Sequence, residues 1–167
     1  MTLAATLKKF LHKHRVQYRV LHHDRTTSLE EAARATGIDR NQMIKASVLW
    51  DGNGYVMAVL PLSAKIDAFK LKRQLHRPLQ LVSRHEIDRL FPDCEPGSHP
   101  PIGEIYHLDW VLDKSLYQLN SVYFESGCHT SLVQISTDDF LFLSSGAFYC
   151  PFADASAIHS VAVSLSN

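Results

Sequence analysis

Apolar residues recur along much of the chain with the three- to four-residue spacing of helices. Leu7 and Leu11 fall on one face of a predicted helix near the start. Ser28 and Glu31 have the spacing of a capping box, which marks a helix start, and Gly37 is of the type that ends one. We expect helices over residues 3–11, from 27 or 28 to 37, and over 67–76, 83–91 and 137–143.

Runs of β-branched and aromatic residues predict strands between these helices. Two such runs, 44–50 and 55–60, are separated by the sequence Asp-Gly-Asn-Gly, whose residues accept the positive φ of a tight turn. The sequence therefore predicts a β-hairpin there. Three prolines and two glycines within residues 93–103 predict an irregular loop. Further strands are expected at 17–22, 79–82, 104–108, 121–125 and 130–135.

The order of these elements indicates the fold class. It is neither a regular alternation of strands and helices nor an all-strand pattern, so it favours an α+β fold with a mixed, curved sheet flanked by helices. The length suits one domain over residues 1–167, with a short tail of small, weakly polar residues from about residue 151.

Membrane segments and disulfides are not indicated. No apolar run approaches the ~18–20 residues of a membrane span, and the N-terminal residues lack the order of features of a signal peptide. Cys94, Cys128 and Cys150 lie far apart and form no Cys-x-x-Cys pair, which argues against a disulfide framework or a zinc ribbon. We therefore expect a reduced, cytoplasmic protein with no membrane partner.

The formal net charge of zero conceals a strong asymmetry. Residues 1–90 hold 16 Lys and Arg against 8 Asp and Glu, whereas residues 91–167 hold 1 against 9. The basic residues gather at 8–15 and 70–77. These clusters are either solvated helix faces or a track for phosphates, on which Lys and Arg displace counterions. The second interpretation predicts tRNA-binding roles for Lys70, Lys72 and Arg73.

Several common catalytic and metal-binding patterns are absent from the sequence. His85 and Glu86 begin a near match to the H-E-x-x-H zinc motif, but Arg89 stands at the second histidine position. Cys128 and His129 have the residue types of a nucleophile and its base. They are neighbours in an extended segment, however, so their side chains are expected to point apart. No phosphate-binding loop or nucleophile elbow occurs, and we expect neither a metal nor a cofactor.

A lysine, a stiff loop and a glycine turn remain as candidate chemistry. Lys45 interrupts an otherwise apolar strand, either as an outward-facing side chain or as a cation in a pocket. The loop from Gly97 to Gly103 combines glycines and prolines, so its backbone can approach a ligand or simply form a turn. The turn that contains Gly127 and His129 is either an ordinary hairpin connection or part of a ligand site.

Taken together, these features resemble the YbaK and prolyl-tRNA-synthetase-associated-domain family of trans-editing aminoacyl-tRNA deacylases. The resemblance spans about residues 15–145. It is carried by four pieces in a shared order: His23 with Thr27-x-x-Glu30-Glu-Ala-Ala33, Gln42-x-x-Lys45, Gly97-x-x-x-Pro101 with Gly103, and Val122-Tyr-x-x-x-Gly127. It implies a mixed sheet curled toward a barrel. It also implies hydrolysis of the ester between a wrong amino acid and the 3′ end of a tRNA, commonly a proline tRNA.

The resemblance assigns roles to the candidate residues. The family's essential lysine falls on Lys45, and some members that edit small amino acids carry a histidine at the position of His129. An aminoacyl ester is already activated, so water can attack it and only the oxyanion needs stabilising donors. Since Pro100 and Pro101 lack amide hydrogens, those donors would come from the three residues before them. The predicted catalytic residues are Lys45, Gly97, Ser98 and His99, and the predicted substrate-binding residues are Pro101, Gly103, Gly127 and His129.

Two other functions are compatible with the sequence. One is a non-catalytic module that binds aminoacyl-tRNA or docks on a synthetase, the prolyl-type enzyme first. The other is a hydrolase of small acyl esters unrelated to tRNA. Retention of Lys45 and of the glycine loop argues against the first, and the basic N-terminal half argues against the second.

Overall fold

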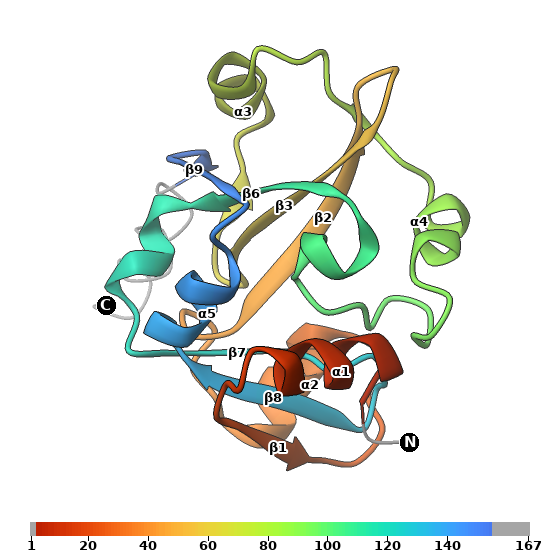
Figure 1. Cartoon of the computed structure of the whole chain (residues 1–167), viewed down its shortest axis with the longest axis vertical. Helices are drawn as coiled ribbons and strands as arrows, with labels where there is room; N and C mark the ends of the chain where they lie inside the picture. The colour runs from red at the N-terminus through yellow and green to blue at the C-terminus, as the bar shows by residue number, and fades with distance from the viewer. Residues whose placement is uncertain (1–2, 155–167) are drawn as a thin grey trace, which may run out of the picture.

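The computed structural model describes residues 3–154. Its centre is a five-stranded mixed sheet in the order β5-β2-β3-β6-β9 (Figure 1). Strand β2 pairs antiparallel with β3 and β5, while β6 runs parallel to both β3 and β9. These strands are β2 (Ile44–Trp50), β3 (Tyr55–Pro61), β5 (Gln80–Leu81), β6 (Asp109–Asp113) and β9 (Phe148–Cys150).

A second, antiparallel sheet has the order β1-β8-β7. Its strands are β1 (Tyr18–His22), β7 (Ser121–Glu125) and β8 (Ser131–Ser136). A parallel bridge between Met43 and Tyr123 joins this sheet to the start of β2. The short strands β4 (Lys65–Ile66) and β10 (Ala153–Asp154) form a separate antiparallel pair.

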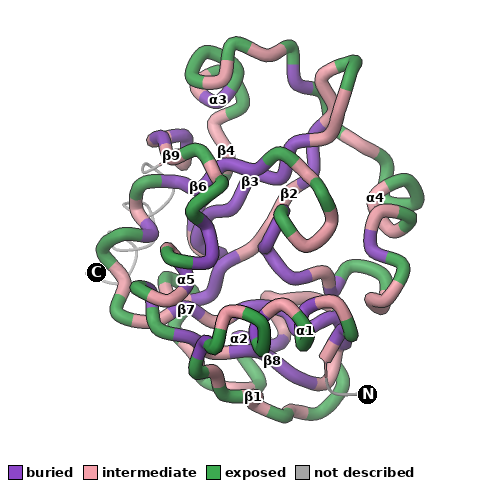
Figure 2. Tube along the Cα trace, viewed as in Figure 1, coloured by how far each residue is buried: buried purple, intermediate pink, exposed green. Residues whose placement is uncertain are grey.

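Helices cover both faces of the three-stranded sheet. Leu7 and Leu11 of α1 (Ala5–Lys13) belong to the main core on one face, and Ala32 and Ala33 of α2 (Leu29–Thr36) pack with Leu132 on the other. Figure 1 shows α3 (Ala68–Leu75) and α4 (Arg84–Leu90) at the periphery, beside the five-stranded sheet. Figure 2 shows the buried residues concentrated along the central strands. The remaining helices are α5 (Thr137–Leu143) and the 3₁₀ turns η1 (Gly103–Tyr106) and η2 (Lys114–Gln118).

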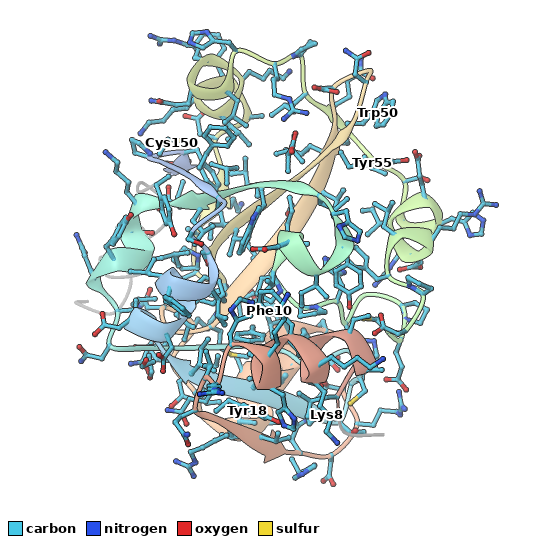
Figure 3. All side chains as sticks on the ribbon, viewed as in Figure 1. Lys8, Phe10, Tyr18, Trp50, Tyr55 and Cys150 are labelled. Atoms are coloured by element: carbon cyan, nitrogen blue, oxygen red, sulfur yellow. The ribbon has the colours of Figure 1, made fainter. Side chains whose placement is uncertain are left out.

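Local sequence signals produce the expected helices and the hairpin. The side chain of Ser28 accepts a hydrogen bond from the Glu31 amide at 3.2 Å, and Gly37 ends α2 with φ of 71°. In the hairpin, Asp51 Oδ1 accepts the amides of Asn53 and Gly54 at 2.8 and 2.7 Å. At its tip, Trp50 and Tyr55 lie side by side, with ring centroids 4.7 Å apart (Figure 3).

The strand expected at 104–108 is wrong. This segment forms the 3₁₀ turn η1, and His107 follows it in the left-handed region with φ of 56°. A Cβ on Gly103 would lie 2.7 Å from Trp110, so the chain must turn tightly there before strand β6 begins. The sequence prediction followed the β propensity of isoleucine and tyrosine and missed β6, whose parallel neighbours lie far away in sequence.

The structure thus confirms a mixed arrangement of helices and sheets, but within residues 3–154 no sheet closes into a barrel. Of the predicted tail, residues 151–154 are described: Phe152 is fully buried and Ala153 pairs with Ile66. The remainder of that tail, 155–167, lies outside the described residues. Across residues 3–154, no helix is long and apolar enough to cross a membrane.

Candidate active site

Lys45 is a half-buried cation on β2. Its strand neighbours Ile44 and Val48 face the main core, so its side chain points to the other face of the strand, toward α2. The ammonium donates to the carbonyl oxygen of Leu62 at 3.4 Å. Burial lowers the pKa of Lys45, and the Glu30 carboxylate partly opposes this. No ion pair of Lys45 occurs within residues 3–154, so its charge is available to a ligand.

The glycine–proline loop is fastened to the turn between β7 and β8. Ser98 is fully buried, and both its amide and its hydroxyl donate to the carbonyl of Glu95, at 3.1 and 2.7 Å. The Gly127 amide donates to the Ser98 carbonyl at 2.9 Å, and the Glu95 amide donates to the Gly127 carbonyl at 2.8 Å. These backbone contacts fix the loop against the end of β7.

His99 attaches the other end of the loop to β2. Its ring stacks on Phe91, with centroids 4.2 Å apart and an interplanar angle of 9°. Its Nε2 donates to the carbonyl oxygen of Ala46 at 3.3 Å, and burial lowers the pKa of the imidazole, which favours the neutral ring. The side chain of His99 therefore holds the loop beside Lys45.

Two of the three predicted oxyanion donors are open. The Ser98 amide is already engaged with Glu95, whereas the amides of Gly97 and His99 have no acceptor in the part of the chain that the structure describes. Gly97 has φ of 81°, which favours glycine at this position. The chemistry expected of the loop thus narrows to the amides of Gly97 and His99.

The other predicted substrate-binding residues form the framework of the loop. Gly127 has φ of 104°, and a Cβ there would lie 2.6 Å from the Ala4 side chain. His129 donates from Nε2 to the Pro96 carbonyl at 2.8 Å, and its amide donates to Glu95 Oε2 at 2.7 Å. Gly103 lies against Trp110, and Pro101 is buried. In this arrangement the side chain of His129 is bonded to the backbone of the loop.

The predicted tRNA-binding residues lie on one helix. Asp67 caps α3, whose exposed surface carries Lys72 and Arg73, with Lys70 half-buried. Phe69 is 70% exposed, and the Arg73 guanidinium carbon lies 5.7 Å from the centre of its ring. A groove of about 540 Å³ separates α3 from β2 and β5. Its lining includes Ser47, Leu49, Leu71, Lys72 and Leu81.

Comparison with known proteins identifies the family. Residues 23–143 match the aminoacyl-tRNA editing domain, a segment that contains Lys45, the loop, the glycine turn and α3. The chain belongs to the aminoacyl-tRNA editing domain family. The resemblance to the YbaK-like deacylases is therefore confirmed. No curated protein matches the sequence of this chain.

Solved structures share the fold of this editing domain at low sequence identity. The hypothetical protein APE2540 is 20% identical, with a TM-score of 0.80 over 89% of this chain and 99% of that one. A protein proposed as a trans-editing enzyme for prolyl tRNA synthetase is 22% identical, with a TM-score of 0.75 over 91% and 97% of the two chains. A protein from Marinobacter aquaeolei, proposed to act in signal transduction, is 20% identical, with a TM-score of 0.75 over 93% of this chain and 32% of that one.

One buried residue of the editing domain escaped the sequence analysis. Glu125 ends β7 and is 6% exposed, and neither of its carboxylate oxygens has a hydrogen-bond partner within residues 3–154. Burial raises its pKa to about 8, and the nearby Cys128 and Glu95 add to the effect. In the sequence, Glu125 stands at the end of the predicted strand Ser-Val-Tyr-Phe-Glu. An acid at that position is typical of the turn that follows a strand, so the pattern did not indicate a buried side chain.

Proposed function

We propose that this editing domain hydrolyses the ester of mischarged aminoacyl-tRNA, a small amino acid on a proline tRNA being the first candidate. The observation that carries the proposal is the fastening of the loop beside Lys45. His99 reaches the carbonyl of Ala46, the residue after the lysine, and leaves the amides of Gly97 and His99 open. A cation on β2 and two free amides in the loop fastened to that strand suit an ester whose carbonyl oxygen becomes negative.

The proposed reaction needs no protein nucleophile. A water oxygen adds to the ester carbonyl carbon, and the carbonyl oxygen becomes an oxyanion held by the amides of Gly97 and His99. The bond from that carbon to the ribose oxygen then breaks. The ribose oxygen takes up the proton that the attacking water loses, which releases the amino acid and an uncharged tRNA. One such donor is typically worth about 3 kcal/mol of transition-state stabilisation.

Lys45 has two possible points of action, and both use its partly desolvated charge. It either polarises the ester carbonyl or binds the ribose and phosphate of the terminal nucleotide. The Lys45 ammonium has three donor hydrogens and uses one for the Leu62 carbonyl. A ligand oxygen can accept another of them without a new charge being buried. Both roles make the lysine necessary for turnover.

The tRNA body is proposed to lie along α3. Lys70, Lys72 and Arg73 supply positive charge for phosphates, and the exposed ring of Phe69 offers a surface on which a base can stack. Ser47, two residues beyond Lys45 on the same face of β2, lines the groove that separates this strand from α3. That groove therefore extends from the basic helix to the face of β2 that carries Lys45.

The test is a panel of mischarged tRNAs, with alanyl-, seryl- and cysteinyl-tRNA for proline as the first members. We expect deacylation of at least one of them, at a rate well above that of the matching free aminoacyl ester. Equal rates on tRNA and free ester would indicate a general ester hydrolase. Binding of charged tRNA without any turnover would indicate the non-catalytic module.

A further inference from the structure

The side chain of Glu125 is a buried acid to which the structure of residues 3–154 gives no hydrogen-bond partner. Its residue is 6% exposed, and both carboxylate oxygens are buried and unpaired within the described chain. Leaving such a group unpaired costs free energy, because it gives up its hydrogen bonds to water. A ligand that forms hydrogen bonds with the two carboxyl oxygens would explain why an acid is present at this buried position.

Strand pairing locates the carboxyl relative to the catalytic lysine. Glu125 lies directly opposite Leu132 in the sheet, so both side chains point to the same face. Leu132 packs there with Met43 and Leu62, and the Leu62 carbonyl accepts the hydrogen bond of Lys45. Glu125 and Lys45 therefore lie at the borders of one apolar cluster beneath α2.

The bridge between the two sheets supports this placement. Met43 pairs with Tyr123 in parallel, and Lys45 and Glu125 each follow the bridge by two residues, so each side chain shares the face of its bridge residue. No ion pair joins the two side chains within residues 3–154. The candidate catalytic loop contacts the residue after Lys45, where His99 donates to the Ala46 carbonyl. It also contacts Gly127, which lies two residues after Glu125 and whose amide donates to the Ser98 carbonyl.

We propose that Glu125 binds the α-ammonium group of the aminoacyl ester. This inference rests on the proposed function. In every aminoacyl ester the α-carbon is bonded to the carbonyl carbon, so the ammonium lies next to the reacting ester. An acid that recognises it must lie near the lysine and loop that act on the ester. The role predicts that the protein prefers esters with a free amino group over N-acylated or peptidyl esters.

Nearby acids and thiols are poorly suited to that role. Glu95 already pairs with Arg25 and accepts the amide of His129. Cys128 lies among the hydroxyls of Ser126, Thr130 and Ser131.

Binding of the ammonium should displace a proton. Burial, assisted by Cys128 and Glu95, raises the pKa of Glu125 to about 8, so the carboxyl holds its proton at pH 7. When the ammonium arrives, that proton goes to solvent and the resulting carboxylate pairs with the cation. The bound pair is neutral, and the charge brought in by the ammonium leaves as the proton.

The experiment compares deacylation of one aminoacyl-tRNA with its N-acetylated form. The tRNA is the one that the wild-type protein hydrolyses fastest. We expect the wild type to prefer the free amine by about 10- to 100-fold, the range of a charge-assisted hydrogen bond. Glu125→Gln should lower this ratio to within about twofold of one. Glu104→Gln, at an exposed glutamate on η1, removes the same charge and should keep the wild-type ratio.

A wild-type ratio in the folded Glu125→Gln protein would overturn the proposal. A second measurement does not depend on how that variant folds. Calorimetric titration of the wild type at pH 7 with a non-hydrolysable 3′-aminoacylamino-adenosine, in two buffers of different ionisation enthalpy, should show release of close to one proton. Binding of this probe without proton release would also overturn it. If the wild type hydrolyses no aminoacyl-tRNA, the proposed function fails instead.

Discussion

At the scale of residues, Lys45 and Glu125 are ionisable side chains held where water reaches them poorly. Burial shifts the two pKa values in opposite directions, downward for the lysine and upward for the acid. Both shifts disfavour the charged form, and neither side chain is neutralised by an ion pair within residues 3–154. Such groups are typical of functional sites, where a ligand supplies the missing interaction.

The buried acid predicts a pH-dependent stability. In the unfolded chain Glu125 loses its proton near its ordinary pKa of 4.5, whereas the folded chain keeps it up to about 8. Its contribution is therefore complete below pH 4.5, falls as the pH rises, and is lost above 8. Glu125→Gln should thus gain stability relative to the wild type as the pH rises through this window, by roughly 4 kcal/mol at most. Urea unfolding at pH 5, 7 and 9 measures the gain, and a pH-independent difference would contradict it.

The backbone contact of His129 predicts a structural effect. His129→Ala removes the hydrogen bond from Nε2 to the Pro96 carbonyl, which is worth about 1 kcal/mol. We expect the melting temperature to fall by a few degrees. Deacylation of alanyl-, seryl- and cysteinyl-tRNA should slow by a common factor, because the loop is displaced alike for all three. A changed ratio among the three rates would show that His129 contacts the amino acid.

At the scale of elements, α3 is a separate basic surface. Asp67 caps its start, and His76 ends it in the left-handed region with φ of 53°. Only Leu71 is fully buried, and the side chains of Phe69, Lys72 and Arg73 are exposed, so they can contact a partner. We therefore propose that tRNA binds to this helix and that ester chemistry takes place at the junction of β2, β7 and the loop.

Reversing the charges of α3 should separate these two functions. The triple variant Lys70→Glu, Lys72→Glu, Arg73→Glu should bind tRNA more weakly and with a flatter dependence on salt, because each lost phosphate contact reduces the slope. Its hydrolysis of a minimal aminoacyl-ester analogue should stay near wild type. The matched control reverses Lys8, Lys9 and Lys13 on α1. An equal loss with both substrates, or an equal effect of the α1 control, would contradict the assignment.

Elements with local signals were predictable, and those that depend on distant pairing were not. Ser28 and Ser83 each cap a helix by accepting the amide of the residue three positions later, so each helix start depends on a short stretch of sequence. Both caps are present in the structure. Strand β6 is defined by parallel neighbours 50 or more positions earlier and more than 30 later, so no short pattern marks it. For the same reason Lys45 was found as a lone charge in an apolar strand, whereas the isolation of Glu125 shows only in three dimensions.

At the scale of the whole molecule, the candidate site occupies the junction of two sheets. Within residues 3–154, one isolated parallel bridge, Met43 with Tyr123, joins them, and the loop contacts both sheets, at Ala46 and at Gly127. Each sheet contributes one of the two unusual ionisable side chains, Lys45 and Glu125. We therefore expect the geometry of the candidate site to depend on how the two sheets are held together, rather than on either sheet alone.

The central claim is that Lys45 supplies the charge for ester hydrolysis. The most direct measurement is single-turnover deacylation of the best mischarged tRNA by Lys45→Ala, with Lys114→Ala as a matched control at an exposed lysine. We predict a loss of at least about 100-fold for Lys45→Ala, in the range of one oxyanion donor, with an unchanged circular dichroism spectrum. The Lys114→Ala protein should match the wild type. Near wild-type turnover by a folded Lys45→Ala protein would contradict the account.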